Sequence, residues 1–280
     1  MIFLRILTAL LAIHVSKAAN EKNAEIGQFP YYVHIASSTN LMNGCKGALI
    51  ARDYALTSAI CMRSILPNEL IVIAGSVTLD EDDMQKIPVD DTFFHKNFTN
   101  NENDTNFDVA IVKLTQKVNL SESVNVISLP GFDATILENK KMTLVGLHYN
   151  DKLRLQFSTV HVIDNNTCME QLRETSFPVL HESQFCVNRV EAKNQFDIPL
   201  GDLLVWTVDS ESIIVGTVCK NKLAVTKIFT YIDWITDVTK SNLSIITMPA
   251  DNNSAFEITC NRTVFALIVA TICVARYFFD

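Results

Sequence analysis

Between residues 29 and 228, the apolar positions occur in short runs that are rich in β-branched and aromatic side chains. Clear examples are residues 31–35, 70–74, 109–114, 142–145 and 212–218. The residues between the runs are often asparagine, aspartate, glycine or proline, which favour turns. Many short strands separated by turns are typical of a barrel or a sandwich, so the pattern predicts an all-β domain.

Only residues 227–240 follow a helical pattern. Their apolar side chains recur at spacings of three, four and seven residues, which gives a helix one buried face. These side chains are Ile228, Tyr231, Ile232, Ile235 and Val238. We therefore expect one helix near the end of the domain, where it closes the fold on its surface.

Residues 1–18 have the composition of a secretory signal peptide. Arg5 precedes an apolar stretch over residues 6–15, and Ser16-Lys17-Ala18 supplies a cleavage pattern of small residues. A buried core helix is the alternative interpretation. Seven Asn-x-Ser/Thr patterns follow in the chain, which predicts a glycoprotein. The acceptor positions are Asn97, Asn103, Asn119, Asn165, Asn242, Asn252 and Asn261.

After the predicted helix, the composition changes to a polar stalk over residues 242–263 and then to an apolar tail over residues 264–280. Twelve apolar residues would span about 18 Å as a helix, less than the ~30 Å hydrocarbon core of a bilayer. Small residues at Asn253, a polar spacer and an apolar tail match the signal for a glycosylphosphatidylinositol (GPI) anchor. A single-pass anchor, which would need help from Arg276, and the absence of any anchor are the alternatives.

The overall composition excludes some classes of function. The chain has 280 residues and a net charge of −8, without a basic run that could follow a phosphate backbone. We therefore expect no nucleic-acid partner, and no pattern indicates a metal or a cofactor. The chain has 7 cysteines. Because thiols normally pair in an oxidising compartment, the odd number leaves at least one free, intermolecular or removed by processing.

Several motifs occur in a specific order. They are IGQFPY at residues 26–31, CKGALI at 45–50 with LTSAIC at 56–61, NFDVAIVKL at 106–114, DIPLGDLLV at 197–205 and YIDWI at 231–235. In order, spacing and residue type, they resemble the chymotrypsin/trypsin family of serine proteases. The resemblance covers residues 24–240. It implies two packed six-stranded antiparallel β-barrels with a C-terminal α-helix, in a trypsin-like domain over residues 19–241.

The resemblance also assigns the catalytic positions. Ile60 stands where the family has its general-base histidine, Leu203 where it has its nucleophilic serine, and Asp108 is the retained triad aspartate. Leucine and isoleucine supply neither a nucleophile nor a base, so we expect no peptide hydrolysis. The oxyanion-hole amides would belong to Gly201 and Leu203. The remaining histidines, His34, His95, His148, His161 and His181, lie outside the motifs in the domain.

The resemblance further implies disulfides Cys45–Cys61 and Cys168–Cys186. It leaves Cys219 either alone or paired with Cys260. Asp197 corresponds to the acidic base of the specificity pocket in trypsin-like members, although it could instead be exposed on a remodelled loop.

Active members of the family are cut before an Ile-Val-Gly-Gly stretch, and the new amino group pairs with the aspartate beside the serine, here Asp202. This chain has Ala18-Ala19-Asn20-Glu21 at that place, so we expect no activation step.

Three functions remain. We expect a cell-surface pseudoprotease that binds an extracellular protease, inhibitor or other protein through its barrel loops. The alternatives are a serine endopeptidase with residual activity and a purely structural surface glycoprotein.

Overall fold

The structure is a computed structural model of the chain. It describes residues 21–63, 65, 69–80, 84–99, 101, 104–133, 138, 140–149, 152–173, 175, 178–189, 199–220 and 223–247. The predicted signal peptide and apolar tail lie outside these residues, as do Asp197, Asn103, Asn252, Asn253, Asn261 and Cys260.

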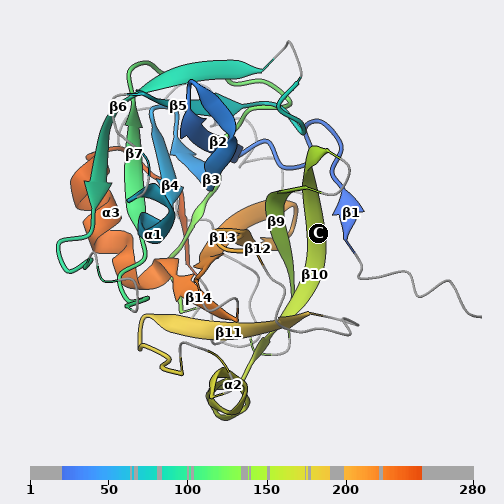
Figure 1. Cartoon of the computed structure of the whole chain (residues 1–280), viewed down its shortest axis with the longest axis vertical. Helices are drawn as coiled ribbons and strands as arrows, with labels where there is room; N and C mark the ends of the chain where they lie inside the picture. Colours follow the sequence, from blue (N-terminus) through green and yellow to red (C-terminus); the bar gives the residue numbers. More distant parts are fainter. Residues whose placement is uncertain are drawn as a thin grey trace, which may run out of the picture.

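The first half of the domain is a closed antiparallel barrel with the strand order β2-β3-β4-β7-β6-β5 (Figure 1). Its strands are β2 (Tyr32–Ser37), β3 (Asn40–Ala51), β4 (Tyr54–Thr57), β5 (Leu70–Ala74), β6 (Gln85–Phe94) and β7 (Ala110–Leu114). The interior is packed with apolar side chains from every strand, such as Val33, Leu49 and Val112. The runs at residues 31–35, 70–74 and 109–114 therefore form strands, as predicted.

The second half forms another six-stranded antiparallel barrel, which the pairing of β9 with both β10 and β12 closes. Its strands are β9 (Lys141–Tyr149), β10 (Leu153–Ile163), β11 (Gln184–Arg189), β12 (Leu203–Val208), β13 (Glu211–Val218) and β14 (Ala224–Lys227). The short β1 (Lys22–Asn23) pairs with β10 at the outside of the barrel. The expectation of two six-stranded antiparallel barrels is confirmed.

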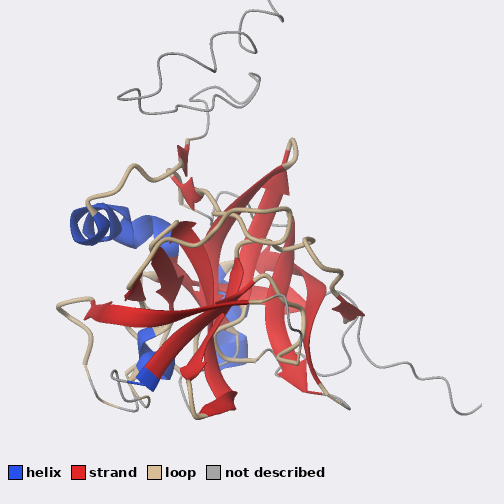
Figure 2. Cartoon of the chain, turned by 90° about the horizontal axis from the view of Figure 1, so that it is seen from above, coloured by secondary structure: helices blue, strands red, loops and turns tan. Residues whose placement is uncertain are grey.

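The largest apolar cluster joins the two barrels. It combines side chains of the first barrel, such as Ala48 and Leu56, with side chains of the second, such as Val145, Leu203 and Ile214. Burying this surface is the main force that holds the barrels together. Strands predominate over helices in the described chain (Figure 2). The boundary between the barrels is a packed core.

The predicted C-terminal helix is present as a 3-10 turn, η3 (Ile228–Tyr231), that continues into α3 (Ile232–Thr239). It ends at Lys240, which has the left-handed conformation that is common after a helix. Although α3 follows the second barrel in sequence, it lies beside β6 and β7 of the first (Figure 1). Trp234 of α3 contacts His95, with 5.4 Å between the ring centres. The helix therefore closes the domain, as expected.

Two further short helices were not predicted. α1 (Ala59–Met62) follows Ser58, and α2 (Asn165–Leu172) follows Asp164, whose carboxylate accepts hydrogen bonds from the N–H groups of Asn166 and Thr167. These side chains cap the helices by accepting from amides that have no partner within the helix. The helices are too short to show a clear apolar period.

The folded chain continues beyond α3. β15 (Ile245–Ile246) pairs in parallel with β8 (Leu129–Pro130), and Ile246 is buried. The Ser244 and Ile246 carbonyls accept hydrogen bonds from the Leu129 and Gly131 amides. The first residues of the segment predicted to be a polar stalk are thus held against the domain.

Candidate functional site

The position that the motifs assign to the triad aspartate lies just before β7, inside the fold. Asp108 is buried, and its Oδ1 accepts hydrogen bonds from the Ser58 hydroxyl at 2.6 Å and from the Ile60 amide at 2.8 Å. The Ser58 hydroxyl also accepts a bond from the Cys61 amide at the start of α1. Asp108 is therefore bound to the first turn of α1 through one hydroxyl and one backbone N–H.

Burial raises the pKa of Asp108 to about 6, and the bonds from Ile60 and Ser58 offset only part of this increase. Its Oδ2 has no hydrogen-bond partner within the described part of the chain. A buried carboxylate with one unbonded oxygen favours its protonated form, because the charged form has lost its hydration. Among the described residues, Asp108 is hydrogen-bonded to Ser58 and Ile60 and to no imidazole.

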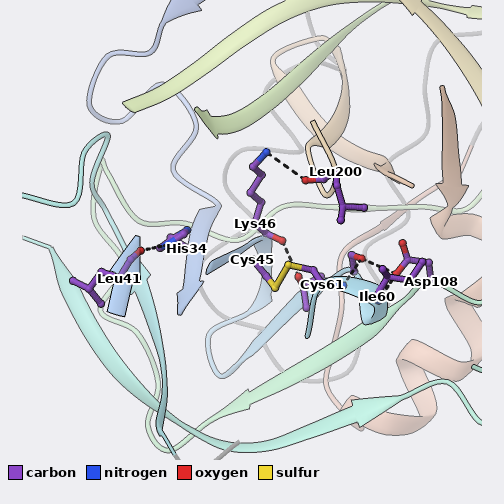
Figure 3. The surroundings of a disulfide bond; sticks show 10 residues. His34, Leu41, Cys45, Lys46, Ile60, Cys61, Asp108 and Leu200 are labelled. Atoms are coloured by element: carbon purple, nitrogen blue, oxygen red, sulfur yellow. Dashed lines mark hydrogen bonds between the residues drawn. A yellow bond between two sulfur atoms is a disulfide. The ribbon is translucent and has the colours of Figure 1, made fainter. Parts of the chain in front are cut away.

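The position that the motifs assign to the general base is also closed to solvent. Ile60 lies in the first turn of α1 and is 5% exposed. The disulfide between Cys45 of β3 and Cys61 holds this turn against the first barrel, with 5.8 Å between the Cα atoms (Figure 3). The backbone of Ile60 is used to bind Asp108, while its side chain cannot accept a proton.

The position that the motifs assign to the nucleophile is the first residue of a strand. Leu203 begins β12, pairs with Val145 of β9 and with Thr217 of β13, and is 0% exposed. Its side chain is part of the apolar cluster between the barrels. Leucine at this place fills the core with an aliphatic side chain, and the strand pairing on both sides fixes its backbone.

The backbone before Leu203 has few free donors. Gly201 has a positive φ of 77°, a conformation that glycine adopts without strain. Its N–H donates to the Val218 carbonyl at 2.8 Å, and the Asp202 N–H donates to the Pro199 carbonyl at 3.3 Å. The Gly201 amide, one of the two assigned to an oxyanion hole, is therefore already bonded to a backbone carbonyl.

Asp202 is a buried charge with two cationic or hydrogen-bonding partners. Its side chain is 1% exposed, forms an ion pair with the ammonium of Lys46 and lies within hydrogen-bond distance of the Nε2 atom of His148. The distances from His148 Nε2 to Asp202 Oδ1 and Oδ2 are 3.0 and 2.9 Å. Burial alone would raise the pKa of Asp202, but the Lys46 charge and the His148 bonds hold it below its ordinary value.

Sequence reasoning missed Lys46 and His148 as partners of Asp202. His148 lies outside the family motifs, and an isolated histidine carries little information by itself. Lys46 did offer a signal, since it stands between Cys45 and Gly47 within a run that is otherwise apolar or small. A lysine among core residues of a strand needs a buried counter-charge. The sequence did not indicate which acidic residue would supply it.

Both expected disulfides are present. Besides Cys45–Cys61, Cys168 of α2 is bonded to Cys186 of β11, with 5.7 Å between the Cα atoms. Within the described part of the chain, Cys219 is a free, buried thiol that contacts Gln184 and Thr226, and burial raises its pKa. The thiol is therefore protonated and poorly reactive in the folded domain.

Four of the predicted glycosylation positions fall on described residues, and all four asparagines are exposed. They are Asn97, Asn119, Asn165 and Asn242. Among the residues the structure describes, no group of three or more His, Cys, Asp or Glu side chains is arranged to hold a metal ion. Within the same residues, no helix combines the length and apolar character needed to cross a membrane.

The two six-stranded barrels and the apolar core between them are the architecture of a trypsin-like serine protease domain. A comparison with protein families matches residues 19–201 to the family described as Trypsin, so the chain belongs to the trypsin family. The match ends at Gly201, directly before Asp202 and Leu203.

Individual relatives are similar at low identity. The chain is 27% identical to the alpha- and beta-fibrinogenase OhS1 of Ophiophagus hannah over 266 residues, which cover 90% of this chain and 100% of the relative. It is 27% identical to mast cell protease 2 of Meriones unguiculatus, over 83% of this chain and 99% of that protein. It is also 27% identical to a chymase of Mus musculus, over 76% and 87% of the two chains.

Proposed function

We propose that this chain is a non-catalytic member of the trypsin family that binds an extracellular protein, such as a protease or an inhibitor, at the cell surface. The observation that carries the proposal is Leu203, an aliphatic residue at the nucleophile position that is buried in a strand of the core. A peptide bond cannot be attacked by a side chain that has no nucleophilic atom and no access to the substrate.

The other catalytic positions support the same proposal. Ile60 cannot act as a base, and Asp108 is bonded to the N-terminus of α1 instead of to an imidazole. In enzymes of this type, the loss of the triad costs on the order of a million-fold in turnover. The domain nonetheless keeps both barrels and two disulfides, so a stable scaffold with loops on its surface remains.

A residual peptidase is the second candidate, because the relatives carry the names of proteases. Fluorophosphonate labelling separates the two, since the probe reacts with an activated serine. With trypsin as the positive control, we expect no labelling of the purified protein. Labelling of the folded protein that is lost when the protein is unfolded before the probe is added would show an activated serine, and would refute the proposal.

The binding role needs its own experiment. Cross-linking on intact cells, followed by capture of the chain and identification of the bound proteins, should recover one extracellular partner in stoichiometric amount. The same capture with a variant that has altered barrel loops is the control. Recovery of no partner in either case would favour a structural surface glycoprotein.

The location at the cell surface is part of the proposal. The predicted signal peptide, the exposed asparagines and the predicted GPI signal at Asn253 support it. Phosphatidylinositol-specific phospholipase C should release the protein from cells, and glycosidase should lower its apparent mass. Retention at the surface with Asp280 still detectable would instead indicate a single-pass anchor, and an unchanged mass would contradict the secretory route.

A further inference from the structure

An ion pair crosses from the first barrel to the second beside the nucleophile position. Lys46 lies in β3, and its side chain, 11% exposed, extends away from the strand toward the segment before β12 (Figure 3). Its ammonium contacts the Asp202 carboxylate and also donates to the Leu200 carbonyl at 3.4 Å. One lysine thus binds a side chain and a backbone oxygen of the same short segment.

The second barrel completes the enclosure of the carboxylate. His148 of β9 contacts both oxygens of Asp202 through Nε2. Gly146 makes this approach possible, since a Cβ at that position would collide with the Asp202 carboxylate and lie 2.8 Å from the His148 Nε2 atom. The carboxylate is therefore surrounded by donors from β3 and β9, and no room is left beside it for a larger residue at Gly146.

Backbone bonds hold the same segment from β13. The Gly201 N–H donates to the Val218 carbonyl, and the Val218 N–H donates to the Asp202 carbonyl at 2.9 Å. A Cβ built on Gly201 would meet no atom within 4 Å. The packing of this glycine therefore does not fix its conformation, and the segment is held by these backbone bonds together with the side-chain contacts of Asp202.

We propose that Lys46 is an internal latch: it fixes residues 199–203 and joins the two barrels, so that this segment reaches its final conformation without a contribution from the N-terminus of the chain. In the family that the motifs resemble, a new N-terminal amino group pairs with this aspartate. Here a side-chain ammonium fills that role. The inference goes beyond the proposed function and does not depend on it.

The latch predicts a local effect of Lys46→Met on hydrogen exchange. Removal of one partner of a buried pair leaves the other charge uncompensated, which is strongly destabilising. We expect the amides of Gly201 and Val218 to exchange on the order of a hundredfold faster, while β2 and β5 change little. Lys113→Met is the matched control, because Lys113 pairs with Asp90 at an exposed site. Equal effects of the two variants would overturn the proposal.

Charge, and not only packing, should carry the effect. Lys46→Met combined with Asp202→Asn removes both charges, so the double variant should lose less protection than the two single variants together. The Lys46→Ala variant lacks the side-chain atoms beyond Cβ, which correspond to an n-propylammonium ion. Addition of this ion should therefore raise the melting temperature of the variant. Addition of 1-propanol, which has a similar shape without the charge, should not raise it. Equal rescue by both compounds would contradict an ionic latch.

Independence from the N-terminus is tested by an insertion. Six residues of Gly and Ser placed between Asn20 and Glu21 would displace any N-terminal amino group from the domain. We expect the exchange of the Gly201 and Val218 amides to stay within about twofold of that in the unmodified protein. If the insertion accelerated the exchange of these two amides as Lys46→Met is expected to do, the N-terminus would contribute to the conformation of the segment. That result would refute the proposal.

Discussion

Leu203→Ser restores the residue type of an active serine protease, and the structure predicts that it damages the fold. Leu203 is 0% exposed, lies in the cluster between the barrels and pairs with Val145 and Thr217. Truncation of a buried leucine to alanine costs about 2–5 kcal/mol. A buried hydroxyl without a partner adds about 1–3 kcal/mol. Because whole domains have a stability of about 5–15 kcal/mol, we expect a loss of about 4–6 kcal/mol that leaves the variant marginally folded.

Urea unfolding at neutral pH measures this loss. The midpoint should fall markedly in Leu203→Ser, while the slope of the free energy against urea stays unchanged. Leu120→Ser is the control, because Leu120 is 49% exposed and the same substitution there should change the free energy of unfolding by less than about 0.5 kcal/mol. If Leu203→Ser cost less than about 1 kcal/mol, position 203 would be an open site and the reasoning would be wrong.

Three further outcomes are expected. Asp108→Asn removes a carboxyl whose pKa is raised to about 6 in the folded state, so wild-type stability should fall relative to the variant by about 2 kcal/mol as the pH rises from about 4 to 6. A difference in the free energy of unfolding between the two proteins that stays constant across this range would contradict the burial argument. Replacement of Cys45 and Cys61 by alanine removes a disulfide that joins residues 16 positions apart, and should lower the free energy of unfolding by about 3 kcal/mol. Wild type in reductant is the control. Ile60→His with Leu203→Ser should not hydrolyse an arginyl chromogenic substrate above a Leu203→Ala control, since the backbone of β12 is fixed as a strand; clear turnover would show a preformed site.

The fold could be predicted because its signals are distributed along the chain. The apolar runs at residues 70–74 and 212–218 correspond closely to β5 and β13, and the period over residues 227–240 to η3 and α3. Such patterns depend on one face of an element being buried, which the sequence records directly. The family motifs then supplied the closure into two barrels, which periodicity alone cannot indicate.

The site was only partly predictable. Family spacing assigned the aspartate and nucleophile positions to Asp108 and Leu203, but it could not show that the Ser58 hydroxyl donates to the carboxylate or that Leu203 is a core residue. Lys46 and His148 are separated from Asp202 by many residues, and nothing in their local sequence pairs them. Contacts of this kind result from the packing of one barrel on the other. They therefore become visible only in the three-dimensional arrangement of the two barrels.

The central claim is tested most directly by peptide hydrolysis with the unmodified protein. The purified full chain is incubated with fluorogenic peptides that offer arginine, aromatic or small residues before the bond to be cut, and trypsin and a chymase serve as positive controls. We predict no turnover above the buffer for any peptide, because Leu203 offers no nucleophile. Hydrolysis proportional to protein concentration and abolished by a fluorophosphonate would contradict the account.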